Sequence, residues 1–127
     1  MIRIDSEENC LLKRRIEMKT FKEYQKEAMK TAPVLDSDGL IDNAVYGLCG
    51  EVGECVDRLK KVKCQGHPQD IEHLIYEMGD ILWYLAEMAT GAGVTLEKVA
   101  EMNIRKLRQR YGETFESAKS INRTDDM

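Results

Sequence analysis

The sequence predicts an all-α fold, a helical bundle of four main helices, and three features of the chain point to it. Apolar residues recur at spacings of three and four, which is the period of an α-helix, and no segment alternates with the period of a strand. Only two prolines interrupt the 127 residues, so long stretches remain compatible with helix. The length suits one domain. We therefore expect a single helical domain.

Turn-forming residues set the bounds of each expected helix. The expected ranges are 21–32 after an N-cap at Thr20, about 40–63, about 71–90 after Asp70, and from Thr95 to near Gly112. Pro33 and the run 36–39 should break the chain before the second helix, as should Gly66 and Pro68 before the third. We expect residues 1–17 to form an N-terminal extension, 18–112 the helical domain, and 113–127 a polar tail that lies over the core or is mobile.

Charge and composition exclude several classes of partner. The formal net charge of −4 provides no basic field for nucleic acid or anionic membranes. No window reaches the roughly 18–20 apolar residues of a membrane span, and the N-terminus lacks a secretory apolar segment, so we expect a cytoplasmic protein. The four cysteines lack CxxC spacing, which argues against zinc. Cys49 and Cys55 lie in apolar-periodic helix, and we expect them to be buried, reduced thiols.

Two similar acidic motifs lie on the second and third expected helices, EVGE at 51–54 and EMGD at 77–80. Residues i and i+3 share a helix face, so antiparallel packing would bring four carboxylates together. Four such anions raise one another's pKa unless a cation compensates their charge. Their oxygen atoms favour a hard divalent cation, Mg²⁺ first and Mn²⁺ second. The predicted ligands are Glu51, Glu54, Glu77 and Asp80.

The glycines within these motifs need an explanation, because glycine inside a helix costs about 1 kcal/mol relative to alanine. Gly53 and Gly79 remove side chains beside the acids, which would allow close helix approach or access for a bulky ligand. An isolated ExxE is usually a solvated face, and Glu54 could simply pair with Arg58 at i+4. Repetition of the motif on consecutive helices weakens that alternative.

Further polar residues continue the acidic faces. Arg58 and Lys61 extend the line of the first motif, and Tyr84 extends the line of the second. Asn103, Lys106 and Arg110 share one face of the fourth helix, although such a set taken alone is more often solvated. A metal site surrounded by such groups suits a polyphosphate ester, since the metal bridges phosphate oxygens and the cations neutralise the remaining charge.

Taken together, these motifs resemble the MazG family of nucleoside triphosphate pyrophosphohydrolases. The family's ExxE, ExxD and N-x-x-K-L-x-x-R-Y segments are matched by EVGE, by EMGD followed by ILWYLA, and by NIRKLRQRY at 103–111. DRLKKVKCQGHPQD at 57–70 and ETFESAKSINR at 113–123 resemble its intervening and C-terminal segments. The resemblance covers about residues 19–123 and departs at Gly112, where the family usually has proline.

The resemblance implies an activity and a set of site residues. A metal-activated water would attack the α-phosphorus of a nucleoside triphosphate, giving the monophosphate and pyrophosphate. Glu51, Glu54, Glu77 and Asp80 would bind Mg²⁺, and our choice for the carboxylate that orients or deprotonates the water is Glu54. The implied contacts to phosphate, or to the acids themselves, are Lys61, Asn103, Lys106 and Arg110. Tyr84 would contact sugar, base or phosphate.

The resemblance also implies a homodimer or homotetramer in which helices of two chains complete the bundle. We expect Trp83 to serve in packing rather than base stacking, and His67 to be structural.

Two alternatives are weighed against this function. A di-iron bundle uses Glu-x-x-His pairs, and neither acidic motif has histidine at its fourth position. A non-catalytic helical module that binds nucleotide or a protein partner has the same helices and differs only in turnover. The base and sugar of the nucleotide and the number of metal ions stay open.

Overall fold

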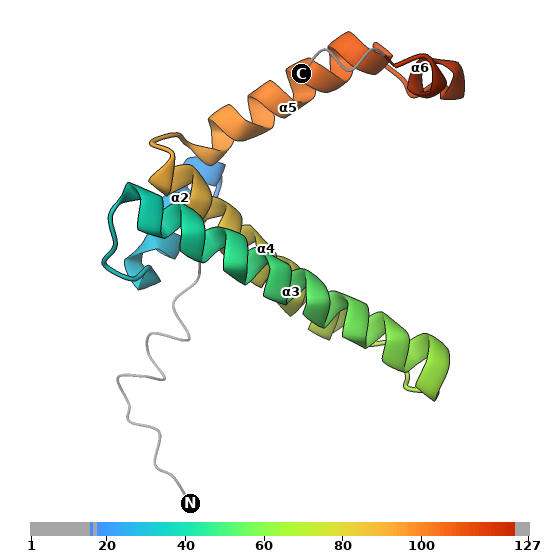
Figure 1. The fold of residues 1–127 in the computed structure, drawn as a ribbon, viewed down its shortest axis with the longest axis horizontal. Coiled ribbons are helices and arrows are strands. Elements are labelled where there is room, and N and C mark those ends of the chain that lie inside the picture. Colours follow the sequence, from blue (N-terminus) through green and yellow to red (C-terminus); the bar gives the residue numbers. More distant parts are fainter. Residues whose placement is uncertain (1–15, 17, 124–127) are drawn as a thin grey trace, which may run out of the picture.

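The computed structural model describes residues 16 and 18–123 of the chain, and every regular element in that part is helical (Figure 1). The elements are α2 (Phe21–Ala28), the 3₁₀ helix η1 (Met29–Thr31), α3 (Ser37–Gln65), α4 (Ile71–Gly91), α5 (Leu96–Tyr111) and α6 (Ser117–Ile121). The all-α class is therefore confirmed. Nearly all of the expected extension 1–17, including Cys10, and residues 124–127 lie outside the described residues.

Side-chain caps fix the start of each of the four longer helices. Thr20 forms a reciprocal capping box with Glu23 at the start of α2. The Asp70 carboxylate accepts a hydrogen bond from the backbone N–H of residue 73 at 3.0 Å, and Thr95 caps α5 in the same way. These three N-caps were predicted. One boundary was wrong, because Asp36 caps α3 and the run 36–39 starts that helix instead of breaking the chain.

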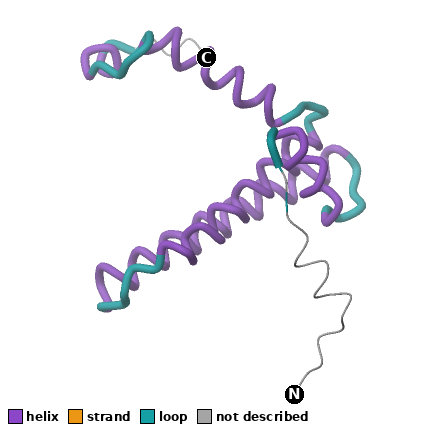
Figure 2. Tube along the Cα trace, turned by 180° about the vertical axis from the view of Figure 1, so that it is seen from behind, coloured by secondary structure: helices purple, strands orange, loops and turns teal. Residues whose placement is uncertain are grey.

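The helices α3 and α4 form a long antiparallel hairpin, and α2, η1 and the beginning of α5 gather at one of its ends (Figure 1). There α2 and the beginning of α5 pack on the C-terminal part of α4, around a small core of Ala86, Ala89 and Leu96. From this junction α5 runs away from the hairpin, which gives the two arms seen from behind in Figure 2. Within one chain the bundle is therefore open.

Large apolar side chains remain exposed along both arms. They include Val45, Val52, Val56 and Leu59 on α3, Ile75 and Met78 on α4, and Val99, Met102 and Ile104 on α5. Cys49 is also exposed and Cys55 is half-buried, both as free thiols, so the expected burial was wrong for Cys49. The physical reason is that the apolar arc of α3 is wider than the strip that α4 covers. No described helix has the combination of length and apolar character that crossing a bilayer requires.

The C-terminal segment packs on the far end of α5. It does not lie over the core, which was one of the two placements expected for it. The rings of Tyr111 and Phe115 lie 5.4 Å apart, and Lys119 Nζ donates a hydrogen bond to the carbonyl of Tyr111 at 3.1 Å. These contacts attach α6 to the last turn of α5 (Figure 1).

Two glycines allow close contact between the helices, and neither of them is Gly53 or Gly79. A Cβ on Gly47 would lie 2.1 Å from Cε1 of Tyr84, and a Cβ on Gly91 would lie 2.8 Å from the carbonyl oxygen of Ser37. At Gly53 and Gly79 a Cβ would meet nothing within 4 Å. The proposed role of Gly53 and Gly79 in close helix approach was therefore wrong within this chain, and open access beside the acids remains their alternative explanation.

Substitution of these glycines should separate packing from helix propensity. We expect Gly47→Ala to lower the free energy of unfolding by about 2 kcal/mol, because the new methyl group displaces the Tyr84 ring. The control Gly53→Ala should raise it by about 0.5–1 kcal/mol, because alanine favours helix and meets no neighbour. Urea denaturation of both variants measures this, and equal effects would contradict the assigned packing.

Candidate metal centre

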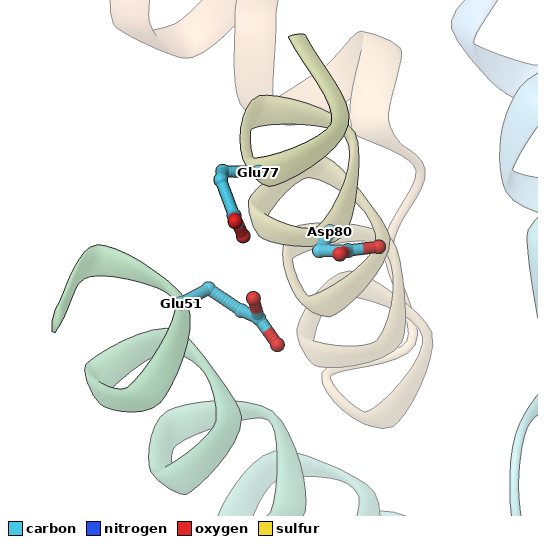
Figure 3. A group of neighbouring side chains, drawn as sticks. All are labelled: Glu51, Glu77 and Asp80. Carbon is cyan, nitrogen blue, oxygen red and sulfur yellow. The ribbon is translucent and has the colours of Figure 1, made fainter. Parts of the chain in front are cut away.

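Three of the four predicted carboxylates meet between α3 and α4. Glu51 reaches from α3 toward Glu77 and Asp80 on α4 (Figure 3), and one oxygen from each of the three lies within 4.8 Å of the others. Glu77 is only 8% exposed, Glu51 is half-buried and Asp80 is exposed, so the group opens to solvent on one side. All donors are carboxylate oxygens, the ligand type that Mg²⁺ and Mn²⁺ favour, and the residues fit such an ion.

Helix periodicity explains why these side chains meet. Asn43, Gly47 and Glu51 follow one another at i+4 and form a line on α3. On α4 the facing line contains Asp80, Tyr84 and Glu87. The two helices run antiparallel. The contact between Gly47 and Tyr84 in the middle of both lines places Glu51 beside the α4 acids one turn away.

Glu54 lies outside the group of three. It is exposed on α3, because a step of three from Glu51 reaches the edge of the strip that faces α4. Its charge nevertheless acts on the site, since Glu54 is one of the anions that raise the pKa of Glu51. Glu54 is thus placed at the rim of the acidic group.

Crowding of like charges changes the protonation of the site. The pKa of Glu51 is raised above its ordinary value of 4.5, first by desolvation and then by the charges of Asp80, Glu77 and Glu54. Burial and the charge of Asp80 also raise the pKa of Tyr24 on α2. The three-carboxylate group is therefore under electrostatic repulsion that a divalent cation would relieve.

One histidine contacts the acidic group. His73 Nε2 lies 2.7 Å from Oε1 of Glu77, one helical turn away on α4. We did not select this residue from the sequence, although its i,i+4 spacing to Glu77 is visible there. His73 orients the most buried of the three carboxylates.

The predicted phosphate contact on α3, Lys61, lies near the tip of the hairpin. Lys61 Nζ pairs with Asp57 at 2.6 Å, and hydrogen bonds from Lys61 and Lys60 lower the pKa of Asp57 to about 2. Lys61 also lines a pocket of about 140 Å³ together with Arg58 and His67. This places two basic groups and an imidazole on one small concave surface beyond the acids.

The predicted residues on α5 are not brought to the acids of the same chain. Asn103, Lys106 and Arg110 lie on the arm that runs away from the hairpin (Figure 2). Lys106 and Arg110 line a pocket of about 480 Å³ where α6 meets α5. Its other lining residues include two further basic side chains and two amides, Gln109, Lys119, Asn122 and Arg123.

The aromatic residues of α4 have structural contacts. Trp83 Nε1 donates hydrogen bonds to the carbonyl of Ala28 and to Oγ1 of Thr31, each at 3.0 Å, and so ties α2 and η1 to α4. This is the packing role that we expected. Tyr84 lies edge-on to Trp83 with ring centroids 5.0 Å apart, and its ring occupies the space left by Gly47.

The helical fold and its acidic group define a small all-α protein with a candidate centre for a divalent cation. The family described as the MazG nucleotide pyrophosphohydrolase domain matches residues 41–115, which include every predicted site residue. The Gene 37 protein of Mycobacterium phage L5 is 34% identical over 79 residues, covering 59% of this chain and 69% of that protein. The chain therefore belongs to the MazG family. A comparison with solved structures found no match.

Removing one negative charge should stabilise the metal-free protein. The folded state holds the Glu51 proton more strongly than the unfolded chain, so protonation of Glu51 stabilises the folded state. This stabilisation is lost as pH rises from about 4.5 through the raised pKa of Glu51. We expect Glu51→Gln to raise the melting temperature of the metal-free protein at pH 7 and to reduce its pH dependence above pH 4.5. Thermal scans in EDTA across this range measure both effects.

The same scans with Mg²⁺ provide the complementary result. Mg²⁺ at one hundred times its Kd should add about 2.7 kcal/mol to the stability of the wild type, and clearly less to Glu51→Gln. A variant that is less stable than the wild type without metal would contradict the repulsion inferred for this group.

Proposed function

We propose that this protein is a Mg²⁺-dependent nucleotide pyrophosphohydrolase that cleaves ribo- or deoxyribonucleoside triphosphates to the monophosphate and pyrophosphate. The observation that carries the proposal is the group formed by Glu51, Glu77 and Asp80 in a chain of the MazG family. The reaction is hydrolysis at the α-phosphorus. Mn²⁺ is the expected substitute for Mg²⁺, because both are hard, oxygen-seeking ions.

The carboxylates have separate roles in this proposal. Glu51, Glu77 and Asp80 hold the cation, while His73 keeps the Glu77 carboxylate in place. When bound, Mg²⁺ polarises phosphate oxygens and lowers the pKa of a bound water. Glu54 is exposed at the rim of the site and does not belong to the three-carboxylate group. In this proposal it is therefore the acid that orients or deprotonates the attacking water.

Basic and polar side chains complete the substrate site. Lys61 contacts phosphate from the hairpin, exchanging its bond with Asp57 for one with the nucleotide. Asn103, Lys106 and Arg110 lie on α5, away from the acids of their own chain, so we propose that the α5 of a second copy supplies them (Figure 2). Tyr84, one turn from Asp80, contacts the sugar, base or phosphate.

The protein acts in this proposal as a homodimer or homotetramer in the cytoplasm, without nucleic acid as a partner. The apolar side chains exposed along α3, α4 and α5 favour association, because contiguous apolar surface is unusual on a monomer. A net charge of −4 favours no nucleic-acid partner.

A nucleotide panel tests the activity and also distinguishes it from binding without turnover. Purified protein with Mg²⁺ should release pyrophosphate from at least one nucleoside triphosphate, and EDTA should abolish the release. Folded protein that binds nucleotides but releases no pyrophosphate from any of them would support the non-catalytic module instead.

Within that assay, Glu54→Gln should separate water activation from metal binding. We expect kcat to fall by about a hundredfold or more, as for loss of a general base, with Mn²⁺ affinity largely kept. The comparison variant Glu77→Gln should weaken Mn²⁺ binding as well, since Glu77 belongs to the group of three. Equal loss of metal affinity in both variants would reject the separate role of Glu54.

The proposed assembly is tested by placing a charge on the apolar surface of α3. Val56 is 60% exposed in one chain, and Val56→Lys should shift the oligomer toward monomer in light scattering coupled to gel filtration. Val34 is a fully exposed residue of the loop before α3, and Val34→Lys is the matched control. Identical masses for the wild type and both variants would remove the α3 surface from the interface.

A further inference from the structure

A polar pair, with Asn43 half-buried and Glu87 fully buried, joins α3 to α4 beyond the acidic group. Glu87 on α4 is 0% exposed, and its two carboxylate oxygens each accept a hydrogen bond from Asn43 Nδ2 of α3 at 3.0 Å. Neither residue belongs to the three-carboxylate group, and no role in the proposed chemistry uses them. A fully buried carboxylate is costly unless it is hydrogen-bonded, so this pair needs its own explanation.

The position of the pair relates it to the metal centre. Asn43 precedes Glu51 by eight residues on α3, and Glu87 follows Asp80 by seven on α4. Both intervals are about two helical turns, or roughly 10–12 Å of rise. The pair and the acidic group therefore lie on the same two facing lines, with the contact of Gly47 and Tyr84 between them.

We propose that Asn43 and Glu87 are positioning residues that fix the register of α3 against α4 and thereby hold Glu51 opposite Glu77 and Asp80. This inference rests on the metal centre of the proposed function. The mutual repulsion of the three acids favours sliding or separation of the helices. An attachment two turns away opposes that movement before the cation is present.

The chemistry of the pair suits this role better than an apolar contact would. Apolar side chains tolerate small displacements along a helix, whereas a buried carboxylate loses its partner when the register changes. A shift of one turn along α3 would place Glu87 opposite Gly47, which has no side chain to donate a hydrogen bond. The same shift would move the Tyr84 ring away from the space that Gly47 leaves for it.

An exchange of the two functional groups tests the proposal. Asn43→Asp places two carboxylates face to face, while Asn43→Asp with Glu87→Gln restores an amide–carboxylate pair of the same length with the donor reversed. Mn²⁺ affinity is measured by electron paramagnetic resonance, and thermal stability is measured on the same samples. Gln25→Leu is the control, because it removes three hydrogen bonds that join α2 to the end of α4, to the following loop and to the start of α5, and it leaves this pair intact.

We expect Asn43→Asp to weaken Mn²⁺ binding by at least about tenfold, as for outer residues that orient metal ligands. The double variant should regain wild-type affinity, and Gln25→Leu should lower stability without changing affinity. The inference is overturned if Asn43→Asp lowers stability alone, or if the double variant regains stability without affinity.

The result is separable from the proposed activity. Wild-type protein that binds Mn²⁺ but hydrolyses no nucleotide would reject the activity, and the affinities of the variants would still decide the role of the pair. Wild-type protein that binds no Mn²⁺ would overturn the metal centre and this inference with it.

Discussion

The antiparallel contact between α3 and α4 is the constraint on which the rest of this structure depends. Both helices carry acids on the faces that meet, and packing brings Glu51 within reach of Glu77 and Asp80 against their mutual repulsion. The opposing attraction comes from close packing, in which the Tyr84 ring fills the space at Gly47. Steric fit at this point therefore helps to hold three like charges together.

The helices α2 and η1 and the beginning of α5 pack on one end of this hairpin. Trp83 attaches α2 and η1, and the small core of Ala86, Ala89 and Leu96 closes the junction with α5. That core is too small to cover the apolar residues along both arms, which stay exposed in the single chain. Association of copies would bury these arms and bring basic residues of α5 to an acidic group, which links the proposed assembly to the proposed reaction.

Local features of the fold were readable from the sequence, and features that depend on register were not. Caps such as Thr20, Asp70 and Thr95 act on their own helix, and the two acidic motifs are visible as spacing alone. The separation of Glu54 from the other acids depends on which edge of α3 faces its neighbour. Likewise, Gly47 is visible as a glycine, but only the facing Tyr84 shows what it is for. The exposure of Cys49 depends on how much of an apolar arc the neighbouring helix covers.

The central claim is that these three carboxylates form one cation site, and anomalous scattering from a crystal soaked in Mn²⁺ tests it most directly. The structure predicts an anomalous peak bounded by oxygens of Glu51, Glu77 and Asp80, in the space between α3 and α4 (Figure 3). A peak at another place, or none in crystals whose hairpin is intact, would contradict the account.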